Sequence, residues 1–323
     1  MNKILSVLTL GILLAAPALL PATIIRNVEK TFTVHPGGHF KAVTTGGDIT
    51  IKTADIGEVR ITAREVVRDS SEAEADVLLK KVDLRLEQSG DNITAEAKYE
   101  SSGLHVAGET WHEKLGLHWG GPPVTVSFIV TLPLKFNASL HTSGGDIAVA
   151  NLTGNVRAQT SGGSLNFDRI EGDLEAGTSG GDITLKEGTA HARLHTSGGN
   201  IHVARAGGPT EVETSGGNIV LESVADLLGA HTSGGDVRAV LTAPLQHDVN
   251  LSTSGGNVSV QLGRTVACLL DAGTSGGGGE ATGLTLTIEK GGVGKSHLVG
   301  AVNGGGPRLK LRTSGGDIQV RAE

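Results

Sequence analysis

The tetrapeptide Thr-Ser-Gly-Gly recurs along this chain at a nearly fixed interval. Its nine copies begin at Thr142, Thr160, Thr178, Thr196, Thr214, Thr232, Thr253, Thr274 and Thr313. The first six copies are 18 residues apart, and the next two intervals are 21 residues. A fixed period in this range is typical of repeat proteins, whose units stack because no unit buries a core alone. The repeat therefore constrains the fold much more than it constrains the chemistry.

Alternating apolar residues flank each copy of the repeat. Those that follow it include Ile147 and Val149, Leu165 and Phe167, Ile183 and Leu185, Ile201 and Val203, Ile219 and Leu221, and Val258 and Val260. Period-two alternation predicts β-strands with one buried face, and the paired glycines predict a corner that needs positive φ or close backbone approach. We therefore expect an all-β fold, a single-stranded β-solenoid in the form of a right-handed β-helix. Its rungs of 18–21 residues would stack in parallel about 4.8 Å apart.

The repeat divides the chain into a regular and an irregular part. We expect the solenoid over residues 138–323, in roughly ten rungs, with Asn303-Gly304-Gly305-Gly306 as the corner of a degenerate rung. Residues 23–137 form an N-terminal β-rich portion of the same stack, because an early corner occurs at Thr44-Thr45-Gly46-Gly47. One short helix is expected at 72–81, where Ser71 and Glu74 make a capping box. This helix would cover the open end of the stack.

Residues 1–22 are typical of a secretory signal peptide. Lys3 precedes an apolar run that ends in small residues at Ala16-Pro17-Ala18 and Pro21-Ala22. The alternative is an uncleaved membrane anchor, against which Pro17 argues; no later segment is long and apolar enough to span a bilayer. Loss of Lys3 makes the formal charge one unit more negative than −7, so nucleic acid is an unsuitable partner. We expect an exported protein of the periplasm, the cell surface or the extracellular medium.

Three features of the chain together resemble a known family. They are the repeated Thr-Ser-Gly-Gly-Asp-Ile unit, the helix before a strand pair, and the segment 303–307, Asn-Gly-Gly-Gly-Pro. They are similar to the bacterial putative-adhesin β-solenoids, cell-envelope domains related to the head GIN domain. The resemblance implies a β-solenoid fold and a location in the cell envelope. It adds little chemistry, although some relatives occur with envelope-stress regulators.

The residue after each Gly-Gly forms a column that could be structural or could bind calcium. Its members are Asp146, Ser164, Asp182, Asn200, Asn218, Asp236 and Asn257. No two carboxylates occupy adjacent rungs in this run, so the acids lie too far apart to share one ion. Asp, Asn and Ser also suit a corner because they hydrogen-bond the backbone of a turn. We favour a structural ladder, and we expect no metal or other cofactor.

Three other motifs have simpler explanations than a functional site. His141, His195 and His231 precede corner threonines three and two rungs apart, too far to share a zinc ion. The segment 290–296, Lys-Gly-Gly-Val-Gly-Lys-Ser, is similar in letters to a deviant phosphate loop, but glycines and Pro307 follow where a helix should begin. We therefore expect a glycine turn between two strands and no nucleotide. Cys268, the single cysteine, lies in an apolar stretch and is expected to be buried and inert.

The segment from His105 to Gly121 is the compositional exception. It holds both tryptophans, Trp111 and Trp119, together with His112, in a chain with only 2% aromatic residues. Tryptophans on a loop could contact a sugar or a protein, or could pack over the open end of the core. The histidine spacing differs from that of a helical zinc motif. We take Trp111, Trp119 and His112 as the candidate binding residues.

Three functions are compatible with these observations. The first is a non-enzymatic, adhesin-like scaffold that presents a rigid face to an envelope protein or a glycan. The second is a polysaccharide lyase or hydrolase, which would need carboxylates and a base clustered on adjacent rungs. The third is a sensor or regulator partner in envelope stress. We favour the first, because the outward charges are scattered and no catalytic residues can be identified.

Overall fold

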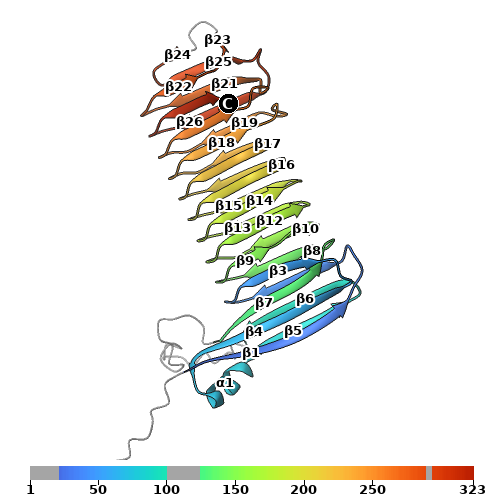
Figure 1. Cartoon of the computed structure of the whole chain (residues 1–323). Coiled ribbons are helices and arrows are strands. Elements are labelled where there is room, and N and C mark those ends of the chain that lie inside the picture. The colour runs from blue at the N-terminus through green and yellow to red at the C-terminus, as the bar shows by residue number, and fades with distance from the viewer. Residues whose placement is uncertain (1–21, 100–123, 289–292) are drawn as a thin grey trace, which may run out of the picture.

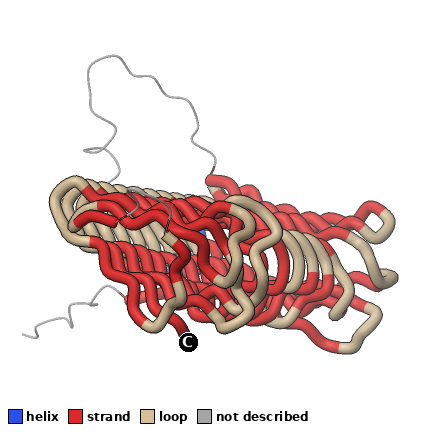
Figure 2. Tube along the Cα trace, turned by 90° about the horizontal axis from the view of Figure 1, so that it is seen from above, coloured by secondary structure: helices blue, strands red, loops and turns tan. Residues whose placement is uncertain are grey.

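The structure is a computed structural model that describes residues 22–99, 124–288 and 293–323. Nearly all of its regular structure is strand, and the one helix in these ranges is α1 (Glu72–Leu79). The strands hydrogen-bond into one continuous sheet that wraps around an elongated core (Figures 1 and 2). The expectation of an all-β chain with one short helix is thus confirmed.

Two parallel ladders of strands run along the molecule. The first ladder contains the strands that end at a Thr-Ser-Gly-Gly corner, at the corner of Thr44 or at Tyr99, and the second contains the strand that follows each of them. In spatial order the first ladder is β6 (Asn92–Tyr99), β2 (His39–Thr44), β8 (Asn137–Thr142), β11 (Val156–Gln159), β13 (Leu174–Thr178), β15 (Ala192–Thr196), β16 (Ile201–Thr214), β17 (Ile219–His231), β19 (Val249–Ser252), β26 (Arg308–Thr313) and β21 (Cys268–Thr274).

The second ladder runs beside the first. In the same order it is β7 (Val124–Pro133), β3 (Ile49–Ala54), β9 (Ile147–Val149), β12 (Leu165–Glu171), β14 (Ile183–Gly188), β16, β17, β18 (Val237–Leu241), β20 (Val258–Leu262), β27 (Ile318–Ala322) and β22 (Gly279–Thr282). The strands β16 and β17 are long enough to belong to both ladders. The short β10 (Leu152–Thr153) pairs with the end of β12. We call one first-ladder strand, its corner and the following second-ladder strand a rung.

The repeat period places equivalent residues above one another. Val156 pairs with Leu174 and Leu165 pairs with Ile183, each one period apart. The alternating apolar residues predicted to face inward are buried in every regular rung, whereas their neighbours face outward. Each rung thus adds a layer of Ile, Val and Leu side chains to one continuous core.

The second glycine of each corner is required by close backbone approach. A Cβ atom on Gly163 would overlap the carbonyl oxygen of Gly145 on the rung below, and the same overlap recurs at the other corners. The first glycine has more room: a Cβ on Gly162 would lie 3.5 Å from its nearest neighbour, the carbonyl oxygen of Gly144. The positive φ values of the described residues occur elsewhere. Of the two reasons considered for these glycines, close approach is therefore the one that applies.

The corner threonines are buried and join successive rungs. The hydroxyl of Thr160 donates to the carbonyl oxygen of Gly145 at 2.9 Å and accepts from the amide of Gly163 at 3.3 Å. The same pair of bonds occurs at Thr178, at Thr214 and at Thr313. Each threonine therefore satisfies two backbone groups that the sharp corner leaves without a strand partner.

At the C-terminal end the spatial order of rungs differs from their order in the chain. The rung of β26 and β27 lies between the rung of β19 and β20 and the rung of β21 and β22, although it follows both in sequence. The corner bonds keep this order: Thr313 donates to Gly256 and Thr274 donates to Gly316, each at 2.7 Å. The rung that contains Thr274 is therefore the outer one, and Thr313 belongs to an inserted rung.

The outermost rung is capped by antiparallel strands. The strand β25 (His297–Val302) pairs with β21, with β23 (Leu286–Thr287) and with β24 (Val293–Gly294). The chain then reverses through Asn303, Gly304 and Gly305, whose φ values are 50°, 90° and 86°, and enters β26. The expectation that this glycine segment forms a corner between parallel strands is wrong, because it follows an antiparallel strand and needs left-handed backbone.

A second inserted rung lies near the N-terminal end. The rung of β2 and β3, with the predicted early corner at Thr44, lies between the rung of β6 and β7 and the rung of β8 and β9. The prediction that the stack includes this corner is confirmed. Below it, β4 (Glu58–Ser70) pairs antiparallel with β7 and with β1 (Ala22–Thr33), and β5 (Val82–Ser89) pairs antiparallel with β6.

Helix α1 lies at this end of the stack, as expected (Figure 1). Ser71 is its N-cap, and the capping box with Glu74 predicted from the sequence is present. Arg26 of β1 forms ion pairs with Glu72 at 3.1 Å and Asp76 at 2.6 Å. Of the helix residues only Ala75 is buried, and the antiparallel strands β1, β4 and β5 also lie at this end, so the role of the helix as a cover stays a prediction.

Alanine substitution at the two corner glycines tests their different roles. Gly163→Ala should lower the free energy of unfolding by about 3 kcal/mol, because its Cβ would overlap backbone that cannot move alone. Gly162→Ala, one residue away, should change it by less than about 1 kcal/mol. Urea unfolding followed by circular dichroism measures both, and equal losses would contradict the close-approach explanation.

Candidate functional site

The polar column after the corners is a hydrogen-bonded ladder. The Asp146 carboxylate accepts a hydrogen bond from the backbone amide of Ser164 at 2.7 Å, and the Asp182 carboxylate accepts one from the backbone amide of Asn200 at 2.6 Å. The pattern continues to the inserted rung, where Asn257 accepts from the Asp317 amide at 2.8 Å. These side chains satisfy backbone donors of the next rung, which gives the column a structural role.

The inserted rungs correct one detail of the calcium argument. Asp48 lies on the rung next to Asp146 and accepts a hydrogen bond from its amide at 2.9 Å, so two carboxylates of the extended column are neighbours. Within the described residues, however, no group of three or more His, Cys, Asp or Glu side chains is arranged to hold a metal ion. Its hydrogen bond makes the pair part of the ladder.

The three corner histidines lie in one outward column, as predicted. Strand pairing places Gln159 and Gly177 between His141 and His195, and Glu213 between His195 and His231. His231 contacts Ser252 on the adjoining strand at 2.9 Å through Nδ1. The structure therefore does not bring the three imidazoles together.

The segment that is similar to a phosphate loop lies in a β-structure. Residues 289–292 are outside the described residues, but β24 begins at Val293 and β25 follows antiparallel to it. A phosphate loop would instead lead into a helix whose N-terminus binds the phosphates. The described side of the segment agrees with the predicted glycine turn between strands.

Trp111, Trp119 and His112 lie outside the described residues. Their segment connects Tyr99, the end of β6, to Val124, the start of β7. On the neighbouring rung the corner lies between Thr44 and Ile49, which pair with Ala97 and Phe128. In chain order the segment therefore stands between a first-ladder and a second-ladder strand, as a corner does in the other rungs. Their role as a contact surface stays a prediction.

Cys268 begins the outermost first-ladder strand and is fully buried. Burial raises the pKa of its thiol to about 11. At neutral pH the thiolate is therefore scarce, and a nucleophilic role is disfavoured. The prediction of a buried, inert cysteine agrees with this environment.

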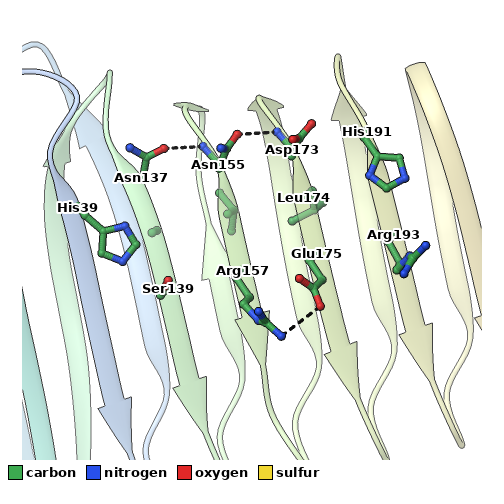
Figure 3. A pocket seen from close by; sticks show the side chains of 12 residues that line it. His39, Asn137, Ser139, Asn155, Arg157, Asp173, Leu174, Glu175, His191 and Arg193 are labelled. Atoms are coloured by element: carbon green, nitrogen blue, oxygen red, sulfur yellow. Dashed lines mark hydrogen bonds and ion pairs between the residues drawn. The ribbon is translucent and has the colours of Figure 1, made fainter.

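A polar groove crosses the outer surface of the first ladder (Figure 3). It has a volume of about 650 Å³ and extends over β2, β8, β11, β13 and β15. One wall is the column at the start of these strands, and the other wall is the column two residues further along. The groove is lined by His39, Asn137, Ala138, Ser139, Asn155, Val156, Arg157, Asp173, Leu174, Glu175, His191 and Arg193.

The first wall is held in place by bonds between rungs. The Asn137 side-chain oxygen accepts from the Asn155 amide, and the Asn155 oxygen accepts from the Asp173 amide, each at 3.0 Å (Figure 3). His39 and His191 continue this column at its two ends. Five rungs spaced about 4.8 Å apart make the groove nearly 20 Å long, which suits an extended ligand.

The second wall carries alternating charges. Arg157 pairs with Glu175 at 3.3 Å, and Arg193 pairs with Glu211 on the next rung at 2.8 Å. Both arginine side chains are about 60% exposed. Exposed pairs of this kind contribute only about 0.2–1 kcal/mol each, so the guanidinium groups can turn towards a ligand at small cost. Arginine is also well suited to bidentate binding of carboxylates.

His39 lies partly buried at one end of the groove. Burial, with a smaller contribution from the Lys41 ammonium, lowers the pKa of this imidazole below its ordinary value. His39 is therefore mostly neutral at pH 7, where it can both donate and accept a hydrogen bond. This end of the groove is suited to hydroxyl or amide groups of a ligand.

A smaller hollow of about 460 Å³ lies on the second ladder, over β12, β14 and β16. Its charged side chains are engaged with one another: Lys186 pairs with Asp168 at 2.6 Å, and Glu187 lies 3.9 Å from both Arg169 and Arg205. This network fills the hollow with internal pairs. The groove on the first ladder is larger and extends over five strands, so we take it as the candidate site.

Sequence reasoning did not find the groove. Most of its side chains occupy repeat positions that vary from rung to rung, and two of the lining strands become neighbours only because β2 is inserted. The detectable signal was the small Ser139 in an outward column otherwise filled by Arg157, Glu175 and Arg193. The groove also depends on the order of the rungs, which the repeat alone does not specify.

Comparisons with known proteins give distant structural similarities. No family model matches the chain, and no curated protein matches it. It is similar to a putative adhesin from Bacteroides fragilis, with 13% identity and a TM-score of 0.43, over 92% of this chain and 97% of that one. It is also similar to a putative lipid binding protein from Parabacteroides distasonis, with 13% identity and a TM-score of 0.38, over 91% and 96% of the two chains.

A putative cell adhesion protein from Clostridium sporogenes has 11% identity and a TM-score of 0.22, over 92% of this chain and 100% of that one. Putative adhesins, whose resemblance was noted from the repeat, are thus among the solved structures similar to this chain. In the described ranges no helix has the length and apolarity needed to cross a membrane.

Proposed function

We propose that this chain is a β-solenoid scaffold that acts by binding, as an adhesin-like protein of the cell envelope. On this proposal residues 1–22 are a signal peptide, residues 23–137 form the capped N-terminal portion, and residues 138–323 form the repeat solenoid. The support for a solenoid is the pair of parallel ladders, whose rungs repeat every 18–21 residues. Export to the periplasm or the cell surface is inferred from the amino-terminal sequence.

The observation that carries the binding function is the groove over five rungs of the first ladder. Its walls are fixed to a sheet whose rungs are hydrogen-bonded at the corner and at the groove, so little side-chain or backbone order would be lost on binding. Its arginines, amides and imidazoles can bind hydroxyl, amide and carboxylate groups. We infer that the ligand is an extended glycan or an extended segment of an envelope protein.

A polysaccharide-cleaving enzyme is the alternative function. Such an enzyme needs two free carboxylates across the scissile bond, one of them acting as a general acid. In the groove Glu175 of the second wall is paired with Arg157, and Asp173 of the first wall lies directly before β13. The two acids lie on opposite walls of the groove, but Glu175 is engaged with Arg157 and is therefore not a free carboxylate, which favours binding over cleavage.

The groove arginines provide the first functional test. The double variant Arg157→Ala, Arg193→Ala should bind envelope polysaccharides or envelope protein extract at least about tenfold more weakly, a loss of about 1.4 kcal/mol. The physical reason is the loss of the two exposed guanidinium groups of one wall. Binding is measured by surface plasmon resonance against a panel of cell-wall and plant polysaccharides and against envelope extract.

Arg238→Ala is the matched control, because Arg238 is an exposed arginine on β18 of the second ladder. It should leave binding unchanged. Equal losses in the control and in the groove variant would contradict a specific site. Release of shortened sugars from any polysaccharide of the panel would favour the enzyme and overturn the binding-only function.

The segment between Tyr99 and Val124 is a second proposed contact region. Its residues Trp111, Trp119 and His112 are proposed to bind the same class of partner, since exposed tryptophans stack on sugars and anchor protein interfaces. The variant Trp111→Ala, Trp119→Ala should reduce capture of partners from envelope extract while the melting temperature stays the same. Unchanged capture would remove the segment from the function, and a large fall in melting temperature would assign the tryptophans to the core.

A further inference from the structure

The inserted C-terminal rung fills a slot between two rungs that precede it in the chain. One side of the slot is formed by β19 and β20, and the other side is formed by β21 and β22. The strands β26 and β27 hydrogen-bond to both sides in parallel register, as Figure 1 shows for β26 between its neighbours. Without this segment, both sides would be open sheet edges with unpaired backbone groups.

Specific corner groups on both sides recognise the segment. On the first side, Gly256 accepts a bond from the Thr313 hydroxyl at 2.7 Å, and Asn257 accepts one from the Asp317 amide at 2.8 Å. On the second side, the Asp317 carboxylate accepts from the Gly278 amide at 2.8 Å. At the start of the segment, Asp248 accepts from the Arg308 amide at 2.8 Å. The slot therefore selects an extended strand with a Thr-Ser-Gly-Gly-Asp corner.

The neighbouring outer rung is a poor substitute for the segment. At the two inward positions where the segment has Ile318 and Val320, the outer rung has Gly279 and Ala281. If this rung collapsed onto β20, Val258 and Val260 would face these small residues and lose much of their apolar contact. An open slot is therefore better filled by a second copy of the segment than by closure of the stack.

The linker to the segment reverses the direction of the chain within a few residues. It consists of Asn303 to Gly306, and Asn303 and Gly304 are exposed with left-handed backbone. The Asn303 amide holds it to the carbonyl oxygens of Arg264 and Val266 at 3.2 and 2.8 Å. A short reversing linker of this type is a hinge that can open to release the following element to another copy.

We propose that this slot is a strand-binding site through which two copies of the chain assemble by exchanging residues 308–322. In the exchanged dimer each slot keeps the same corner bonds and the same core contacts, now made to the segment of the partner copy. The two stacks are joined at their C-terminal ends, so both first-ladder grooves remain free for bivalent binding. The interaction itself does not depend on what the groove binds.

Cysteine pairs placed across the slot test the exchange in the full chain. Ser259 of β20 and Gln319 of β27 are direct partners facing outward, close enough for a disulfide. One chain carries Ser259→Cys and a second, differently tagged chain carries Gln319→Cys, both with Cys268→Ala. After they are unfolded and refolded together at high concentration and then oxidised, we expect a covalent heterodimer of twice the 32.9 kDa chain mass.

The matched control is a pair on consecutive rungs, Asn166→Cys and Thr184→Cys, on β12 and β14. It should give no heterodimer, because these rungs are not inserted. A single chain with both Ser259→Cys and Gln319→Cys, refolded alone at low concentration, must close its internal disulfide, which shows that the variants fold. If that chain closes and the mixed chains stay monomeric, or if the control pair links equally well, the proposal is wrong.

Discussion

The close approach of glycine backbone at the corners is the constraint on which the rest of this structure depends. No side chain fits between the second glycine of one corner and the carbonyl of the corner below, as at Gly163 and Gly145. This contact fixes the spacing and register of the rungs at one edge of the molecule. The buried threonines and the Asp, Asn and Ser column then satisfy the backbone groups of that edge. The apolar columns stack in register as a consequence.

Because the corner fixes the register of the rungs, the outward residues at the other end of the first-ladder strands can vary. These strands end at the corner and begin at the groove, where the outward residues change from rung to rung. Side chains there are supported by a rigid sheet and need not form the core. The repeat is therefore the scaffold of this protein, and the candidate site lies on the groove face, where outward side chains differ from rung to rung.

The local features of the fold could be predicted from the sequence, whereas the order of the rungs could not. The alternation around Ile147 or Leu165 predicts a half-buried strand, and Ser71 with Glu74 predicts the start of the helix, because both patterns act over a few residues. The corners that lie next to Thr313 are far from it in the chain, and their sequences are so similar that the sequence alone does not identify them. Packing decides which rung lies at the end. Ile318 and Val320 keep most apolar contact when a rung covers them on both sides, whereas the rung with the small residues Gly279 and Ala281 loses less apolar contact at the end of the stack. The groove depends on the same choice at the N-terminal end, where β2 is inserted.

One corner ladder runs without interruption through both inserted rungs. Amide hydrogen exchange measured residue by residue tests it most directly, because every amide of the polar column is bonded to the rung before it in space. The account predicts slow exchange at Asp146, Asp317 and Gly278, comparable to that of Ser164 in the regular part of the stack. Fast exchange at Asp146, or at Asp317 and Gly278, with protection confined to the regular rungs would contradict it.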